Sequence, residues 1–377
     1  MPAEGAPALS AIRPELACPG PVVRSGLQSL PTYQPPSGRG GLLRLDANEG
    51  PPPPAALLRE LLQETAAGLV YYPEYGRLIQ AAATHYGVSP AEVLPVAGAD
   101  EGIRLVMQAF CGPGDRVATV RPTFSMYALY ARMAGAGMIE IPLGTGHRPD
   151  LPALLAAVAD ATLTVLASPN NPTALALTRA ELLSLLEASA GRPFLLDETY
   201  AEFCGQNFVP LTETYPNLIV LRTLSKARGL PGLRCGFVLG APAVVAQLDT
   251  IRSPYNLSAA AVTIGAGVLE RDAGYPGRLA RAVGARREVQ ARLGQAGLGS
   301  FASVTHFFLL PLGALAPAAA SYLRSRGILV RLWGDGGAAC LRISLCTSEE
   351  GNQLLRELLP WLERRPVGAE TASRRDR

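Results

Sequence analysis

A regular alternation of short apolar runs and helix-like segments between residues 93 and 225 is the feature that most constrains the fold. The segments between the runs repeat apolar residues at helical spacing, and turns rich in Gly, Pro and Asn separate the elements. The predicted strands are VLPVAG (93–98), RVATV (116–120), MIEIPL (138–143), TLTVLA (162–167), FLLDE (194–198) and LIVLRTLS (218–225). Strands that alternate with helices form a mostly parallel sheet flanked by helices. The sequence therefore predicts an α/β fold.

The pattern changes after about residue 265, where a long arginine-rich helix (about 276–295) precedes three strand-like runs and a final helix. This second pattern predicts a smaller α+β domain. Helix starts are marked by residue pairs that form capping boxes, in which each side chain bonds the other's backbone N–H. These pairs are Ser89 and Glu92, Thr178 and Glu181, and Thr347 and Glu350. We expect four parts: an N-terminal arm (1–45), a large α/β domain (46–265), a small α+β domain (266–365) and a flexible tail (366–377).

Composition excludes several classes of protein. Charged residues make up 17% of the 377 residues, and 48% are hydrophobic, which is typical of a folded chain. A net charge of +3 without a basic stripe predicts no nucleic-acid partner. No apolar run reaches the ~18 residues of a membrane span, and the N-terminus lacks the apolar centre of a signal peptide, so we expect no membrane partner. The six scattered cysteines suit a reducing compartment, and we expect a cytoplasmic location.

A metal site is also not indicated. No two cysteines form a C-x-x-C pair, and the chain has only three histidines, His85, His147 and His306. We interpret these histidines as structural or surface residues.

Lysine is almost absent, since Lys226 is the only one among 34 basic side chains. The excess of arginine fits a chain that is also rich in Ala, Gly and Pro, as codon bias would produce. Arginine replaces lysine in charge but cannot be deprotonated in a protein, so it cannot serve as an amine nucleophile. A single retained lysine therefore suggests a chemical role, although chance survival on the surface is the alternative.

Polar residues gather at the carboxyl ends of the predicted strands, where α/β sheets bind ligands. Their chemistry matches the needs of pyridoxal 5'-phosphate. Lys226 can bond the cofactor's aldehyde, and Asp197 can face the ring nitrogen and keep it charged. Asn171 and Tyr200 can donate to the phenolic oxygen, and Phe124 can stack on the ring. The alternatives are a helix cap for Asp197, a turn for Asn171 and plain core packing for Phe124 and Tyr200.

The cofactor's phosphate needs donors as well. Backbone N–H groups at the helix start from Gly98 through Ala99 to Asp100 can supply some of them. The side chains of Ser225 and Arg234 can supply others. We assign Thr223, on the same turn as Ser225, to this group. For Asp100 we expect the side chain to cap its own helix.

The chain resembles the fold-type I aminotransferases of class I/II, and among them most closely the histidinol-phosphate aminotransferases. The resemblance runs from LDANEG (45–50) to RISLCTSEE (342–350). Between these ends lie YYPEYG (71–76), GADEGI (98–103), AFCGPGD (109–115), PTFSMY (122–127), SPNNPT (168–173), LDETYAEF (196–203) and LRTLSKARGLPGLRCGF (221–237). One such motif is weak evidence, but this many in the family's order is strong. The resemblance implies an aspartate aminotransferase-like fold.

The resemblance also implies roles for further residues. It implies a homodimer with the site at the interface, in which Tyr72 reaches the partner's cofactor phosphate. Arg342 would bind the anionic group of the substrate or of glutamate, with Arg331 as its helper. Tyr33 would cover the substrate, and Asn48 in LDANEG would contact it. The implied reaction moves an amino group between histidinol phosphate, a small anionic donor, and 2-oxoglutarate, with Lys226 as general base and Asp197 and Tyr200 as its catalytic partners.

The chain departs from the family's pattern at four places: Ala174 replaces a glycine, Thr199 a small residue, Arg228 an apolar or small one, and the prolines 51–54 a less proline-rich loop near the substrate. If position 174 needs a positive φ, alanine costs about 1 kcal/mol there. Three alternative functions stay open. One is an aminotransferase for aromatic amino acids or a specialised pathway, the second is a pyridoxal phosphate-dependent decarboxylase of a phosphorylated amino acid, and the third is a catalytically silent ligand-binding or regulatory protein.

Overall fold

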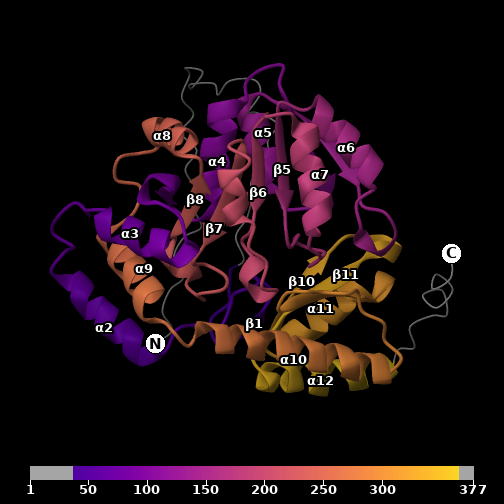
Figure 1. Cartoon of the computed structure of the whole chain (residues 1–377). Coiled ribbons are helices and arrows are strands. Elements are labelled where there is room, and N and C mark those ends of the chain that lie inside the picture. The colour runs from indigo at the N-terminus through magenta and orange to yellow at the C-terminus, as the bar shows by residue number, and fades with distance from the viewer. Residues whose placement is uncertain (1–36, 365–377) are drawn as a thin grey trace, which may run out of the picture. The chain divides into compact units, whose positions relative to one another are not determined.

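The computed structural model describes residues 37–364, which contain two β-sheets (Figure 1). The larger sheet has seven strands in the order β2-β8-β7-β6-β5-β3-β4. Their bounds are β2 (Val93–Val96), β3 (Arg116–Arg121), β4 (Gly137–Pro142), β5 (Leu163–Ala167), β6 (Phe194–Asp197), β7 (Leu218–Thr223) and β8 (Gly236–Gly240). Strands β4, β3, β5, β6 and β7 are parallel, whereas β8 runs antiparallel to both of its neighbours. The predicted α/β fold with a mostly parallel sheet is confirmed.

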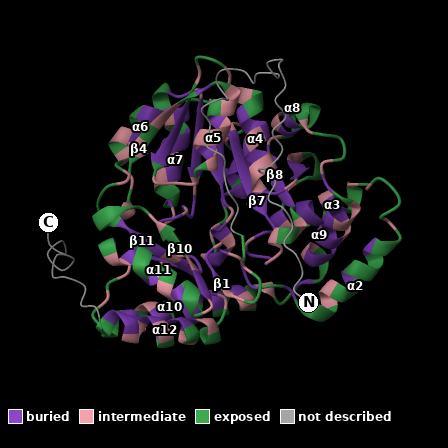
Figure 2. Ribbon diagram, turned by 180° about the vertical axis from the view of Figure 1, so that it is seen from behind, coloured by how far each residue is buried: buried purple, intermediate pink, exposed green. Residues whose placement is uncertain are grey.

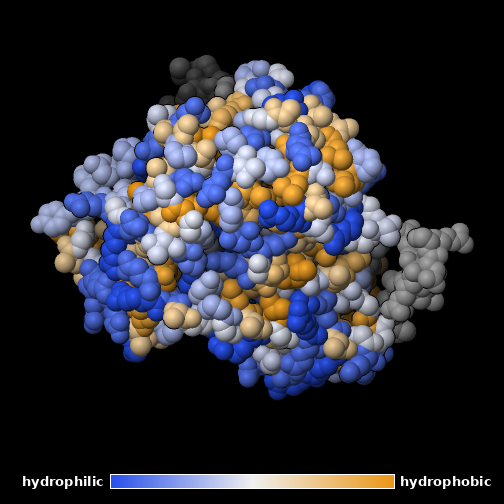
Figure 3. Space-filling model, in the orientation of Figure 1, coloured by the Kyte–Doolittle hydropathy of each residue, from blue (hydrophilic) through white to orange (hydrophobic). Residues whose placement is uncertain are grey.

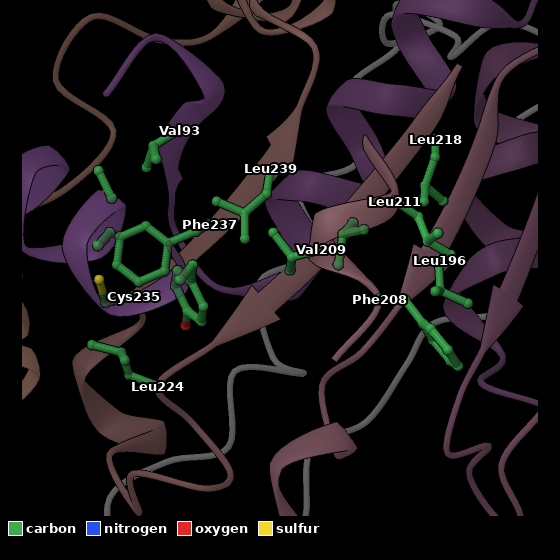
Figure 4. Packing of buried hydrophobic residues seen from close by; sticks show 14 of the residues in the cluster. Val93, Leu196, Phe208, Val209, Leu211, Leu218, Leu224, Cys235, Phe237 and Leu239 are labelled. Carbon is green, nitrogen blue, oxygen red and sulfur yellow. The ribbon is translucent and has the colours of Figure 1, made fainter. Parts of the chain in front are cut away.

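Helices cover both faces of this sheet (Figure 1). Helices α4 (Ala99–Phe110), α5 (Met126–Ala134) and α8 (Pro242–Ile251) pack on one face. The cluster on the other face includes residues of α2 (Ala55–Ala66), α3 (Gly76–Tyr86), α6 (Leu151–Asp160), α7 (Arg179–Ser189) and α9 (Ala259–Arg271). Figure 4 shows part of this second cluster, where Phe237 and Leu239 of β8 lie near Val93. Since both faces are covered, the central strands β5, β6 and β7 are buried and mostly apolar, as their sequences predict.

The smaller sheet has four strands in the order β1-β10-β11-β9. Its strands are β1 (Leu43–Leu45), β9 (Phe307–Pro311), β10 (Ile328–Trp333) and β11 (Cys340–Ser344). Helices α10 (Tyr275–Gln295), α11 (Ala316–Ser325) and α12 (Ser348–Glu363) pack with it around a second apolar core. In Figure 2 the buried residues concentrate on the strands, and exposed residues lie on the outer sides of the helices. The exposed side of α10 is mostly hydrophilic in Figure 3.

The predicted helix starts are confirmed. Capping boxes are present at Ser89, Thr178 and Thr347, although the first of them begins a single turn of 3-10 helix. The end of the expected N-terminal arm forms β1, which pairs with β10. The predicted division at residue 265 falls inside α9, and the boundaries of the four expected parts stay a prediction. Between residues 37 and 364 no helix is long and apolar enough to cross a membrane.

Candidate active site

Lys226 lies in the turn that follows β7, at the carboxyl end of the large sheet. Its Nζ donates a hydrogen bond to the carbonyl oxygen of Ala47 at 2.9 Å and lies 5.8 Å from the centre of the Tyr200 ring. The chain at Gly50 passes so close that a Cβ there would lie 1.8 Å from the Lys226 carbonyl oxygen. Glycine is therefore required at position 50, because any side chain would push the 46–50 segment away from Lys226.

Asp197 ends β6 and is buried. Its Oδ2 accepts from the Tyr127 hydroxyl at 2.7 Å, and its Oδ1 accepts from the Thr199 backbone N–H at 3.0 Å. Burial raises the pKa of this carboxyl, while the donors at Thr199 and Tyr127 act in the opposite direction. Two hydrogen-bond donors therefore hold the carboxylate in a fixed position. A carboxylate that faces the cationic ring nitrogen of a cofactor needs to be held in this way.

The two asparagines of SPNNPT have separate positions. Asn170 shapes its loop, since its Nδ2 donates to the Pro122 carbonyl at 2.9 Å and its Oδ1 accepts from Thr123. Asn171 instead meets Arg342, whose Nη1 donates to its Oδ1 at 2.6 Å. Arg342 comes from β11 of the smaller sheet, so this contact joins the two sheets at the site.

Tyr200 and Asn48 also meet, with Asn48 Nδ2 donating to the Tyr200 hydroxyl at 3.2 Å. Asn48 has a φ of 50° and is 1% exposed. Its Oδ1 is buried and has no hydrogen-bond partner within residues 37–364. A buried acceptor without a donor is costly, so this oxygen is available to a bound ligand.

A cradle of donors lies at the start of α4. Its cap residue Gly98 has a φ of 78°, and a Cβ there would lie 2.3 Å from Nη2 of Arg234. Arg234 donates to Ser225 Oγ at 3.2 Å and pairs with Asp100 Oδ2 at 3.3 Å. The prediction that Asp100 caps its own helix is wrong, because its side chain pairs with Arg234, and it is Glu101 that accepts from a backbone N–H at this helix start, that of Ala97. Ala99 begins the helix, whose first N–H groups lack intrahelical partners.

The turn that carries Lys226 is shaped by Thr223. Its Oγ1 accepts from the Ser225 backbone N–H at 3.1 Å and bonds to the Ser225 hydroxyl at 3.0 Å. Thr223 therefore orients Ser225, whose hydroxyl also meets Arg234.

Phe124 stands edge-on to Tyr127 at 5.7 Å, so it lies near the Asp197 end of the site. Tyr72 lies elsewhere: it is 73% exposed and stacks on Tyr255 with ring centres 4.1 Å apart. Arg331 is exposed on β10, and its Cα pairs with that of Arg342 on β11. Tyr33 falls outside the described residues.

His306 is fully buried and stacks on Phe203 with ring centres 4.1 Å apart. Burial, and secondarily the charge of Lys226, lowers the pKa of His306 to about 3, so the ring is neutral. This buried position, against Phe203 and near the Tyr200 ring, fits the interpretation of His306 as a structural residue.

Two parts of the site were not anticipated. One is Tyr127, which holds Asp197, and the other is the backbone of residues 46–50. Tyr127 belongs to the PTFSMY motif and follows Phe124 by three residues, which is about one helical turn. This spacing is the signal by which the sequence could have placed Tyr127 beside the site. A backbone carbonyl leaves no such signal in the side-chain pattern.

Two of the departures from the family's pattern, Ala174 and Arg228, have structural answers. Ala174 has a φ of 59°, so the position does require the left-handed region, and its methyl group packs in a cluster with Tyr200 and Phe307. Burial of that methyl offsets part of the backbone cost, since each buried carbon of this kind contributes about 0.8 kcal/mol. Arg228 is 1% exposed, with its guanidinium 3.4 Å from the centre of the Tyr275 ring and close to Asp272.

The donor set fits pyridoxal phosphate. The chain's only lysine follows β7, and a buried carboxylate ends the neighbouring strand β6. The cradle of cationic, hydroxyl and helix N-terminal donors lies at the start of α4, and the buried unpaired amide oxygen of Asn48 follows β1 of the smaller sheet. This site, on an α/β sheet of this topology, defines a pyridoxal phosphate-dependent enzyme of fold type I.

Comparison with known proteins identifies the family. The model of the family "Aminotransferase class I and II" matches residues 41–358, so the chain belongs to the class I and II aminotransferases. It is 34% identical to an aromatic amino acid aminotransferase of Rhodococcus opacus, over 89% of this chain and 94% of the relative. It is 36% identical to a histidinol-phosphate aminotransferase of Roseiflexus castenholzii, over 83% of this chain and 88% of the relative.

Solved structures agree. The histidinol-phosphate aminotransferase of Sinorhizobium meliloti, in complex with pyridoxal-5'-phosphate, superposes with a TM-score of 0.83 at 27% identity, covering 91% of this chain and 98% of that one. An aspartate aminotransferase from Thermus thermophilus has the same fold, with a TM-score of 0.75 at 20% identity and coverage of 90% and 99%. The predicted family, fold and cofactor are confirmed.

Proposed function

We propose that this aminotransferase moves the amino group of histidinol phosphate to 2-oxoglutarate, which yields imidazole-acetol phosphate and glutamate. The observation that carries the proposal is the cross-strand pair of Arg331 and Arg342. Residues paired in this way point to the same face of the sheet, and two like charges directly opposite each other are unfavourable unless an anion lies near them. A phosphate monoester carries a charge of about −1.5 to −2 and can pair with both guanidinium groups, whereas the single carboxylate of phenylalanine carries a charge of about −1. The second carboxylate of glutamate would also lie near this pair in either candidate enzyme.

When bound, pyridoxal phosphate supplies an aldehyde that takes up an amine and a ring that withdraws electrons from the substrate carbon. In our proposal the Lys226 amine holds the cofactor, and Asp197 keeps its ring nitrogen charged. Asn171 and Tyr200 face the ring oxygen, and Phe124 covers the ring. The phosphate is held by Ser225, Thr223, Arg234 and the N–H groups of Ala99 and Asp100.

Lys226 also carries the proton in this proposal. Once the substrate amine has taken its place, the free Lys226 amine would remove the proton from the substrate Cα and deliver it to the cofactor carbon that had carried the aldehyde. The Tyr200 ring, whose hydroxyl accepts from Asn48, lies 5.8 Å from that amine. Arg342 binds the anionic end of the substrate, and Asn48 and Tyr33 complete the substrate's surroundings.

We further propose that the enzyme is a homodimer. Large apolar side chains are exposed together on one surface, namely Leu69, Val70, Tyr71, Tyr72 and Tyr255. The stacking of Tyr72 on Tyr255 makes this surface continuous, and an exposed apolar patch of this kind marks an interaction site. The second copy would cover it, and Tyr72 would then reach the partner's phosphate cradle. Val70→Asp should yield monomers in sedimentation analysis, and an unchanged sedimentation coefficient would refute the interface.

The donor is tested by a single-turnover absorbance measurement. Histidinol phosphate and phenylalanine are added separately to the holoenzyme without a keto acid, and loss of the cofactor's yellow band is followed. We expect histidinol phosphate to act at far lower concentration. If phenylalanine acts at the lower concentration, the proposed donor is wrong.

The second candidate is an aromatic amino acid aminotransferase, which the relative in Rhodococcus opacus favours by its coverage of the chain. Arg331→Gln separates the two candidates. For a histidinol phosphate enzyme, this variant should raise the half-saturating concentration of histidinol phosphate about tenfold and leave that of phenylalanine unchanged, because a charge-assisted bond contributes about 1.5–3 kcal/mol. Arg356→Gln, an exposed arginine on α12, is the control.

A further inference from the structure

Residues Asp46–Gly50, which we call the strap, follow β1 and touch three functional side chains. The carbonyl oxygen of Asp46 accepts from Arg342 Nη2 at 2.7 Å, and that of Ala47 accepts from Lys226 Nζ at 2.9 Å. The Asn48 amide donates to the Tyr200 hydroxyl. One short segment therefore places the amine, the anion-binding guanidinium and the phenol relative to each other.

Arg39 forms ion pairs with two carboxylates of the strap. Its Nη2 donates to Asp46 Oδ1 at 2.9 Å and its Nη1 to Glu49 Oε1 at 3.2 Å. Only 15% of the Arg39 side chain and 8% of the Asp46 side chain are exposed, so this contact is shielded from water more than a surface ion pair. The planar fork of an arginine binds two carboxylate oxygens in a fixed geometry, which a lysine cannot do.

The inner side of the strap is closed by packing. Gly50 lies against the Lys226 carbonyl, and the ring of Phe203 lies 3.5 Å from where a Cβ of Gly50 would stand. The main chain of Asn48 and Glu49 approaches the buried ring of His306, which itself stacks on Phe203. This inner surface consists of rings and a close backbone contact, so it limits how far the strap moves inward. Arg39 supplies the charged contact that stops it from moving outward.

We propose that Arg39 is a positioning residue of the aminotransferase, which acts on the reaction by holding the strap. With the strap held, the Asp46 carbonyl keeps Arg342 extended toward Asn171, and the Ala47 carbonyl is placed to accept from the Lys226 amine when that amine is not bonded to the cofactor. An incoming carboxylate or phosphate then meets Arg342 already in its binding position, and the Asp46 oxygen is the partner that it replaces. The proposal rests on the proposed roles of Lys226 and Arg342 but not on which amino donor is the physiological one.

The test compares Arg39→Gln with Arg44→Gln in the holoenzyme. Arg44 is the matched control, because within residues 37–364 its ion pair is with Glu49 alone, at 3.6 Å, and its side chain is 47% exposed. Two measurements are made: hydrogen exchange of the backbone amides of residues 44–50, and the half-reaction with glutamate. For Arg39→Gln we expect exchange of this segment about tenfold faster at an unchanged thermal midpoint, because local opening is governed by local contacts.

We expect the half-saturating glutamate concentration and the maximal rate to respond differently. The half-saturating glutamate concentration should rise about tenfold in Arg39→Gln, with a change of less than about threefold in the maximal rate, because a contact of Arg342 that binds substrate and transition state equally affects saturation and not the maximal rate. Arg39→Lys should recover part of the effect, because it keeps the charge but not the fork. Arg44→Gln should resemble the unaltered enzyme in both measurements.

Three results would overturn the proposal: Arg39→Gln behaving like Arg44→Gln, faster exchange without a change in glutamate saturation, or a lowered thermal midpoint with faster exchange throughout the chain. The last of these would show a merely structural role. An enzyme that reacts with glutamate but not with histidinol phosphate would refute the proposed donor, and the strap would still be tested by the glutamate measurements.

Discussion

The two ends of the candidate site differ in how far one chain completes them. At the ring end, Asp197 and Tyr127 are buried, 6% and 0% exposed, and bond to each other. At the phosphate end, the side chains of Arg234 and Asp100 are 48% and 44% exposed. The ring end is therefore organised by the chain alone, while the phosphate end is open to solvent in a single copy.

This difference separates two kinds of consequence. A change at the buried end removes a contact that contributes to folding as well as to cofactor binding, because a buried polar group that loses its partner is costly. A change at the exposed end removes a contact of little value to the fold, because exposed ion pairs contribute about 0–1 kcal/mol. A substitution at the buried ring end should therefore lower both the free energy of unfolding and the cofactor affinity. A substitution at the exposed phosphate end should lower the cofactor affinity with little change in the free energy of unfolding.

The largest effect is expected at Lys226, which the two ends share. Lys226→Arg keeps the positive charge but cannot act as an amine nucleophile, so we expect transamination to be abolished, as in Lys226→Ala. The measurement is glutamate turnover together with the visible absorbance of the bound cofactor. Activity retained in either variant would contradict the proposed role of this lysine.

At the buried end, Tyr127→Phe removes one of the two donors to Asp197. We expect the free energy of unfolding of the apoprotein to fall by about 1–3 kcal/mol, and cofactor affinity to fall with it. Urea unfolding and a cofactor titration measure the two quantities. If affinity changes while stability does not, the buried end is no more coupled to the fold than the exposed end.

The buried end also predicts a dependence of stability on pH through His306. Its pKa of about 3 in the folded protein lies below the ordinary value of 6.5, so protons bind preferentially to the unfolded chain between these values. The contribution of this residue to the free energy of unfolding is fully present above about pH 6.5. It decreases as the pH falls and is about 2 kcal/mol smaller at pH 5.

The variant His306→Phe keeps an aromatic ring against Phe203 and removes the titration. Between about pH 7.5 and pH 5 it should therefore lose about 2 kcal/mol less free energy of unfolding than the unaltered protein. Both proteins are measured at one protomer concentration. An equal loss in the two proteins would show that His306 does not carry this pH dependence.

The smallest effect on stability is expected at the exposed end. Arg234→Gln should change the free energy of unfolding by less than about 0.5 kcal/mol and weaken cofactor binding about tenfold or more, because it removes a charged partner of the phosphate. Thermal unfolding of the apoprotein and the cofactor titration test this together. A substantial loss of apoprotein stability would remove the distinction between the two ends.

Local patterns in the sequence predicted much of the fold and the placement of side chains at strand ends. The apolar runs of β5, β6 and β7 and the capping pairs at Thr178 and Thr347 act through neighbours in the sequence, so they can be recognised without a structure. The lone Lys226 was recognised because its chemistry is unique in the chain. The contact between Asn171 and Arg342 supports grouping these residues in one site.

The missed features depend on distant contacts or on the backbone. Asp100 turns from its helix to Arg234 because the fold brings a cation beside it, which helix propensity cannot reveal. The antiparallel direction of β8 and the pairing of β1 with β10 are likewise tertiary choices. The role of the strap is carried by carbonyl oxygens, which every residue possesses, so no residue type marks it.

The pairing of β1 with β10 sets an order of events during synthesis. Leu43 leaves the ribosome before its partner in the sheet, Ile328, which follows all strands of the larger sheet in the sequence. Domains form as the chain emerges, N-terminal parts first, yet this strand has no partner until Ile328 has been made. The strap that follows β1 is therefore anchored late, and we expect a nascent chain that stops before β10 to lack an ordered strap even when its large sheet has formed.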